Sequence, residues 1–443
     1  MALNAYLKRM GADRRAYFKI HRRPRDRAAF LKRQQKKLAA LRQAAACTVP
    51  SPAPVPPPAF PGAPFSPSLS KPSFADDRSS VRQPWVGEWG PKSDPYFLPG
   101  TGRLRGLIVP VDFVDAPATR SVEFYRDLLI PPAATWYRDA SYGRLSLDLT
   151  IFSRWVRMSK PIAAYGLQNC CPDQATYDFM AELVGRIDPE VDFSQVDAIY
   201  AVGPESSGPN LNILLYRRWP GEGIVADGKE LRWGVVGNGN FPSADTAYLL
   251  AHYMITHETG HLMGLADQYG RDCPTCADTH DWVGAWSMMD TANPPSAHFL
   301  AWDKWLLGWL TADQVRGLTG SGAIDGWLTP SEAPGGVKLL VVPTSDHTLY
   351  AVEVRRASGE DRMLSDQGVL VYTVDSSVRN GQGPIRLRQA HASDPSQVGR
   401  CGPIWNSAFD LGLGEVATYE DGTIKVDVLE TDGTNYHVQV VRK

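Results

Sequence analysis

The 443-residue sequence lacks any apolar run close to the roughly 20 residues that a membrane-spanning helix requires, so no membrane span is predicted. It also lacks the compact apolar segment that follows the basic start of a secretory signal peptide. Lys and Arg recur through residues 1–45 instead, and the apolar run of residues 38–49 is interrupted by Arg42 and Gln43. Because the formal net charge is only -2, the sequence after this basic arm is acidic.

Cysteine is also scarce. The six cysteines are Cys47, Cys170, Cys171, Cys273, Cys276 and Cys401. An even number is compatible with disulfides in an oxidising compartment, although the pairing stays open. The Cys273–Cys276 pair would need two more ligands to hold a metal, and none stands at a suitable spacing. A structural disulfide is therefore the favoured interpretation.

The composition predicts four segments. Residues 1–48 form a basic arm or pro-region, and residues 49–99 a proline-rich linker that cannot build a core. Residues 100–325 alternate strands with helices, which is typical of an α+β domain. Residues 326–443 contain short alternating strands between turns, which predicts a small all-β, sandwich-like domain. The basic arm lacks the aromatic platforms of a nucleic-acid groove, and no nucleic acid is expected to bind the α+β domain.

Hydrophobic periodicity places the individual elements. In the α+β domain strands are expected at residues 104–114, 145–156, 196–202 and 231–236, and helices at 124–142, 174–187 and from 247 through His261. In the β domain strands are expected at residues 337–343, 349–355, 368–374, 385–389, 423–429 and 435–441.

The most informative motif lies in the third of these helices. His257 and His261 stand at positions i and i+4, so both imidazoles project from one face, one turn apart. That separation suits two ligands of a tetrahedral zinc ion. Glu258 follows the first histidine, where it can act as general base on a water that the metal activates. Chance produces HExxH in a chain of this length on the order of one time in a hundred.

Two further residues extend the motif to HExxHxxGxxD. Gly264 can adopt the left-handed conformation that ends the helix and turns the chain back. Asp267 then becomes a candidate third metal ligand. The alternative for Asp267 is a structural cap, or a hydrogen-bond partner that orients a histidine.

Residues after the motif add candidates. Met289, in preference to Met288, is expected to lie beneath the metal, as in the Met-turn of metzincins. Tyr269 and His298 are candidates for the hydrogen-bond donor that stabilises the transition state. Three acidic residues could bind Ca²⁺, although a solvated acidic loop is the commoner outcome; they are Asp272, Asp278 and Asp281.

The catalytic segment resembles the immune inhibitor A family of bacterial zinc metalloproteases. The family continues its HExxHxxGxxD motif as Leu-Pro-Asp-x-Tyr, and residues 265–269 read Leu-Ala-Asp-Gln-Tyr. Residues 286–289 (Trp-Ser-Met-Met) and 301–304 (Ala-Trp-Asp-Lys) are similar to further family landmarks, and the resemblance covers roughly residues 100–375. It implies a zincin or metzincin-like catalytic domain, with a mixed twisted sheet and an active-site helix, in a secreted protein. The N-terminus shows no clear signal peptide, which keeps a cytoplasmic location as the alternative.

The expected function is therefore a zinc-dependent endopeptidase acting on proteins or peptides. His257, His261 and Asp267 would hold the metal, and Glu258 would serve as general base and then acid. The alternatives are a dedicated maturation protease or amidase for one partner, and a zinc-binding interaction protein without turnover. The oligomeric state is left open.

Overall fold

The computed structural model describes residues 96–167, 173–237, 254–270, 280–290, 297–391 and 407–443, apart from short gaps at 205, 208–210, 212, 346, 363, 365, 379–381 and 413. The basic arm, most of the proline-rich linker and all six cysteines lie outside these residues. Within them no helix is long and apolar enough to cross a membrane. Several sheets with few helices make up this part of the chain, which confirms the predicted α+β class.

A six-stranded sheet forms the first layer, in the order β2-β1-β4-β8-β5 with β3 paired to β1. Its strands are β1 (Gly102–Asp112), β2 (Leu145–Ile151), β3 (Val156–Arg157), β4 (Ala198–Val202), β5 (Leu214–Arg217) and β8 (Trp233–Gly237). All pairs are parallel except β5 with β8. All four strand segments expected here are present, but the segment 145–156 is divided into β2 and β3. A separate hairpin joins β6 (Ile224–Ala226) and β7 (Lys229–Leu231).

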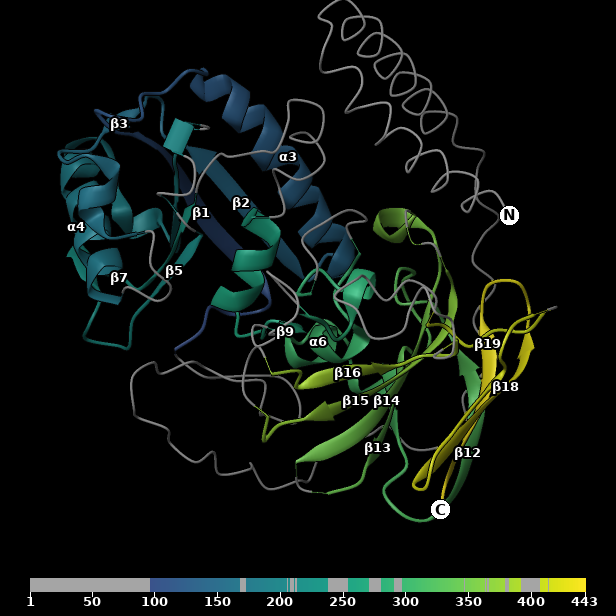
Figure 1. The fold of residues 1–443 in the computed structure, drawn as a ribbon. Helices are drawn as coiled ribbons and strands as arrows, with labels where there is room; N and C mark the ends of the chain where they lie inside the picture. Colours follow the sequence, from purple (N-terminus) through teal and green to yellow (C-terminus); the bar gives the residue numbers. More distant parts are fainter. Residues whose placement is uncertain are drawn as a thin grey trace, which may run out of the picture. The chain divides into compact units, whose positions relative to one another are not determined.

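Helices α3 (Val122–Ala140) and α4 (Asp173–Ile187) cover opposite faces of this sheet (Figure 1). Alternate residues of β1 serve the two faces, as the period of two requires. Leu104 and Ile108 join the apolar cluster that contains α3, whereas Leu107 and Val109 join the cluster that contains α4. In the described residues, 3-10 helices lie at Ile162–Tyr165, Asp188–Glu190, Phe193–Gln195, Gly284–Trp286, Ala312–Gln314 and Gly359–Asp361.

Two further sheets pack their apolar faces together in the C-terminal part. One has the order β11-β13-β14-β15-β16 and the other β12-β19-β18-β17. The strands of the first are β11 (Val315–Gly317), β13 (Leu339–Pro343), β14 (Thr348–Arg355), β15 (Gly368–Asp375) and β16 (Ile385–Arg388). Those of the second are β12 (Gly322–Leu328), β17 (Thr418–Glu420), β18 (Ile424–Thr431) and β19 (Tyr436–Arg442). Valines of both sheets share one core cluster, and all six strands expected here are present.

Two details differ from the segment boundaries expected from sequence. Strand β12 runs across residue 325, where the catalytic domain was expected to end, because it pairs with β19 along its whole length. At the other boundary, Tyr96, Phe97 and Leu98 fall in the expected linker, yet all three are buried. The Leu98 amide donates a hydrogen bond of 2.9 Å to the carbonyl of Leu262.

One apolar cluster also joins the α3 side of the first sheet to the outer face of β13, β14 and β15. A buried group of charges centred on Arg355 lies in this region. The Arg355 side chain is fully buried and forms ion pairs with Asp361, Glu332 and Glu353. Its Nη1 also donates to the carbonyl oxygen of Trp286 at 2.8 Å. Burial alone would lower the pKa of this guanidinium, but the three carboxylates raise it.

Replacing Arg355 is therefore expected to lower the free energy of unfolding strongly. Arg355→Met leaves Asp361 and Glu332 buried without their cation, and losing one partner of such a group costs about 3–5 kcal/mol. Urea unfolding followed by tryptophan fluorescence measures this loss of unfolding free energy. The matched control is Arg362→Met, whose side chain is 58% exposed and whose surface pair is worth less than about 1 kcal/mol. Equal stability losses for the two variants would contradict the importance of the buried group.

Candidate metal centre

The helix that carries the motif is described over residues 254–262. Its buried side faces the cluster that contains α3, where Ile255 and Leu262 pack. Two tyrosines fix its backbone and one of its side chains: the Tyr137 hydroxyl donates to the carbonyl of Thr256 at 2.5 Å, and the Tyr200 hydroxyl lies 2.8 Å from Oγ1 of Thr259. The helix is therefore held by hydrogen bonds from α3 and β4.

His257 and His261 lie together, as their spacing predicts. Both are buried, and their ring centroids are 4.7 Å apart. In each ring Nδ1 is 2.7 Å from a backbone carbonyl oxygen, that of Met288 for His257 and that of Leu265 for His261. A carbonyl only accepts, so each Nδ1 carries the hydrogen and each Nε2 of a neutral ring keeps its lone pair. This is the tautomer that a metal-ligating Nε2 requires.

Asp267 completes the group. Its Oδ1 lies 3.0 Å from Nε2 of His261 and 3.4 Å from Nε2 of His257. A tetrahedral ion with ligand distances of about 2.0–2.1 Å holds neighbouring donor atoms about 3.3–3.4 Å apart. Within the described ranges, these three residues form the one group of metal-ligand side chains whose donor atoms lie within 4.8 Å of one another. The two distances from Asp267 are therefore close to those between the ligands of a tetrahedral metal ion.

Gly264 makes this approach of Asp267 to the helix achievable. Its φ of +97° confirms the predicted left-handed conformation. A Cβ at this position would lie 2.9 Å from the ring of Phe97, so space as well as backbone conformation requires glycine. The turn also places the carbonyl of Leu265 on Nδ1 of His261.

Neighbouring charges and hydrogen bonds shift the pKa values of His257 and Asp267. Burial by itself lowers the pKa of His257, but the hydrogen bond with Asp267 and the charge of Glu258 raise it to about 9. Burial by itself raises the pKa of Asp267, but His261 and His257 hold it well below its usual range. The metal-free group thus keeps a proton that a metal ion must displace.

Hydrogen bonds join the segment after the helix to Met289 and to Asp303. The Met289 carbonyl accepts from the amide of Gln268 at 2.8 Å, and the Gln268 side chain donates to Oδ2 of Asp303 at 2.7 Å. Asp303 belongs to α6 (Ala301–Leu306). A Cβ at Gly260 would lie 2.6 Å from Sδ of Met289, so the Met289 side chain packs against the helix between the two histidines. Met289 thus lies against the helix that carries His257 and His261, and its place beneath a metal stays a prediction.

The other catalytic candidates predicted from the sequence are Glu258, Tyr269 and His298. Glu258 is half-buried on the helix, directly after His257. The Tyr269 ring stacks on that of His257, with centroids 6.3 Å apart. His298 packs against Trp136, and its amide donates to Asp361 beside Arg355. Burial lowers the pKa of His298 to about 3, and of the two donor candidates only Tyr269 has a described contact with the metal group.

Asp272 and Asp278, two of the three calcium candidates, lie outside the described residues. The third, Asp281, is in the short strand β10 (His280–Asp281), which pairs with β9 (Tyr269–Gly270).

Sequence reasoning missed several supporting residues. The carbonyl of Met288, rather than its side chain, orients His257, and no residue-type pattern marks a carbonyl. The Gln268–Asp303 bond joins residues far apart in the sequence. Gly260, inside the motif itself, is the one signal that could have been found, because a glycine within a helix often marks a close approach.

No protein-family model matches the chain, and no curated protein sequence matches it either.

Metal binding is expected to release protons. At pH 7.5 the metal-free His257 holds its proton, since its pKa is about 9, and ligation of a metal requires the neutral ring. Zinc binding should therefore release about one proton per ion, and the apparent affinity should rise about tenfold per pH unit between about pH 6 and 8. Titration calorimetry in two buffers of different ionisation enthalpy measures the released protons. Heats that do not depend on the buffer would contradict the assigned proton.

Gly264→Ala should weaken both the fold and the site. The left-handed φ and the contact with Phe97 together cost about 1–3 kcal/mol of unfolding free energy. Zinc content after dialysis should fall with it, because Leu265 and Asp267 follow this turn. The matched control is Gly185→Ala in α4, where a Cβ meets no atom within 4 Å and alanine should stabilise by up to about 1 kcal/mol. A Gly264→Ala protein as stable as the control would refute the requirement for glycine.

Proposed function

We propose that this protein is a zinc-dependent endopeptidase with a metzincin-like centre. One observation carries the proposal: two imidazoles with Nδ1 committed to carbonyls, and a carboxylate, converge on one point beside Glu258. A donor set of two nitrogens and one oxygen suits zinc, and three protein ligands leave a position free for water and substrate.

The proposed chemistry uses few residues. His257, His261 and Asp267 would hold the zinc, which would supply the Lewis acidity that polarises a carbonyl and acidifies water. Glu258 accepts the proton of the attacking water and passes it to the leaving amine nitrogen. Its side chain is half-buried, whereas both histidines are buried, so it is the member of the group that solvent and substrate reach. Tyr269, stacked on His257, is the candidate donor to the carbonyl oxygen as that oxygen gains charge.

Two further features support the metzincin-like assignment. Gly264 reverses the chain after the helix, so that a residue six positions after His261 reaches the same point. Met288 and Met289 then bring a backbone carbonyl and a side chain against the helix. The resemblance to the immune inhibitor A family adds the expectation of a secreted protein with polypeptide substrates.

Glu258→Gln is the direct test. It removes the base while leaving all three ligands, so kcat/KM on a fluorogenic peptide should fall by about 10²–10⁴-fold with zinc content unchanged. Glu190→Gln, a surface change in the Arg154 ion pair, is the matched control and should leave activity intact. Metal analysis and initial rates on the same preparations give both quantities.

The outcomes separate the alternatives. Peptide cleavage that persists in the Glu258→Gln variant would contradict the proposed mechanism. A wild-type protein that holds one zinc but cleaves neither casein nor peptides would instead favour a dedicated protease, an amidase or a binding protein.

A further inference from the structure

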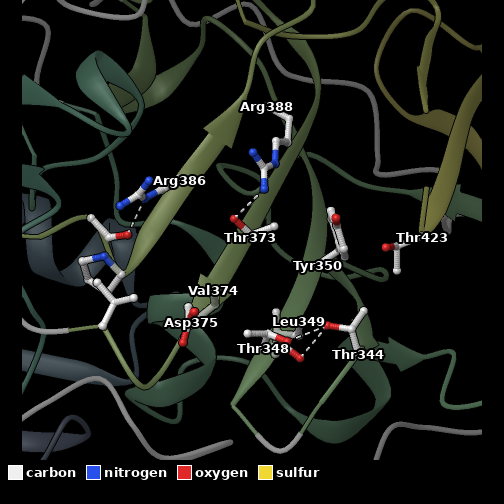
Figure 2. A pocket seen from close by; sticks show the side chains of 13 residues that line it. Thr344, Thr348, Leu349, Tyr350, Thr373, Val374, Asp375, Arg386, Arg388 and Thr423 are labelled. Atoms are coloured by element: carbon white, nitrogen blue, oxygen red, sulfur yellow. Dashed lines mark hydrogen bonds between the residues drawn. The ribbon is translucent and has the colours of Figure 1, made fainter. Parts of the chain in front are cut away.

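A pocket of about 440 Å³ opens on strands β14, β15 and β16 (Figure 2). Tyr350 lies opposite Thr373 in the strand register, and Thr373 lies opposite Arg386. Because side chains two positions apart share a face, Thr348, Asp375 and Arg388 line the same surface. We call this surface the polar pocket.

The polar pocket continues the inner face of the paired sheets. Farther along β14 and β15 the same face carries Val352 and Val371, which are buried against β18 and β19. Thr423, directly before β18, lines the edge of the pocket. The residue types thus change from valine to threonine, tyrosine and arginine where the second sheet stops covering the first.

The two arginines of the polar pocket are oriented but not neutralised. Nε and Nη2 of Arg386 donate to the carbonyls of Gly383 and Gln382, and its guanidinium lies 4.0 Å from the ring centroid of Trp282. Nη2 of Arg388 donates to Oγ1 of Thr373 at 3.3 Å. Within the part of the chain that the structure describes, neither arginine forms an ion pair, and the Nε of Arg388 is buried without a partner. Donor capacity therefore remains in the pocket.

The nearby carboxylates are already engaged. Oδ1 of Asp375, within the pocket, accepts from the amide and hydroxyl of Ser377. Asp421, next to it in space, accepts from the hydroxyls of Tyr350 and Tyr419. The pocket lining thus contains two arginines and one aspartate, with the charge of Asp421 beside them on Tyr350.

We propose that the polar pocket binds a carboxylate of the polypeptide substrate, and so acts as an exosite of the proposed peptidase; this inference rests on the proposed function. The planar guanidinium fork matches a carboxylate in shape. A carboxylate brings a single negative charge to these arginines, whereas a phosphate group would bring about −1.5 to −2 beside Asp375 and Asp421. The carboxylate comes from an acidic side chain or from a chain end, which are chemically alike.

Hydrogen bonds of Trp282 connect the polar pocket to the candidate metal centre. The Trp282 carbonyl accepts from the amide of Leu387 in β16, and the Trp282 amide donates to Asp290. Asp290 directly follows Met288 and Met289, which hold His257 and the helix. Arg386 of the polar pocket thus packs on Trp282, whose backbone is bonded to the segment that supports the proposed catalytic residues.

Binding of labelled peptides to the full-length Glu258→Gln protein tests the proposal without turnover. Three octapeptides are compared by fluorescence anisotropy: an amidated polyglutamate, an amidated polyglutamine, and polyglutamine with a free C-terminal carboxylate. The polyglutamate should bind at least about tenfold more tightly than amidated polyglutamine, since hydrogen bonds to charged groups are the strong ones. Added salt should weaken this difference. Tight binding of the third peptide would assign the carboxylate to a chain end, and its failure to bind would assign it to side chains.

Substitutions of the two pocket arginines test whether the polar pocket causes the preference for polyglutamate. Adding Arg386→Gln and Arg388→Gln should abolish the preference, and Arg388→Gln alone, which keeps the Arg386–Trp282 contact, should lose part of it. Arg126→Gln with Arg154→Gln, two exposed arginines, should keep the preference. Thermal melts confirm that each variant is folded. Equal binding of polyglutamate and amidated polyglutamine, or a preference that survives the double pocket variant, would overturn the proposal. If instead the pocket variants lose the preference while the wild-type protein cleaves nothing, the carboxylate site stands and the proposed peptidase fails.

Discussion

Two hydrogen bonds determine the orientation of His257 and His261 and therefore which of their nitrogen atoms are available to a ligand. Each histidine of the HExxH pair gives its Nδ1 hydrogen to a backbone carbonyl, which leaves the two Nε2 lone pairs and Asp267 facing one another. Three acceptors cannot share one buried point unless a proton or a cation lies between them. In the metal-free chain a proton fills this role, which is why the pKa of His257 is raised. The same arrangement, with the proton displaced, is the metal site that we propose.

The rest of the fold holds those two carbonyls in place. The Leu265 carbonyl is set by the left-handed turn at Gly264, and the Met288 carbonyl by the segment that begins at Trp286. Arg355, from strand β14, holds the Trp286 carbonyl within a buried group of carboxylates. The C-terminal sheets therefore support the candidate metal centre, and the polar pocket lies on the same inner face as their shared core.

Sequence patterns predicted what local geometry determines. The spacing of His257 and His261 fixes a shared helix face, and Gly264 fixes a reversal, so the candidate ligands could be named without a structure. Most strands were predicted for a similar reason, since alternation reflects burial on one face. Contacts between distant segments were not predictable. Arg355 reads as an ordinary charge at the end of a strand, and one of its partners, the Trp286 carbonyl, has no signature in the sequence. Strand β12 was missed because its two glycines and its aspartate weaken the alternation that strand prediction relies on.

X-ray absorption spectroscopy of the zinc-loaded protein identifies the ligand atoms of the metal themselves. We expect a first shell of nitrogen and oxygen at about 2.0–2.1 Å, with the outer-shell scattering of two imidazoles and no sulfur. A shell containing sulfur at about 2.3 Å would place the metal on cysteines instead. Scattering from fewer than two imidazoles would likewise contradict the assignment to His257 and His261.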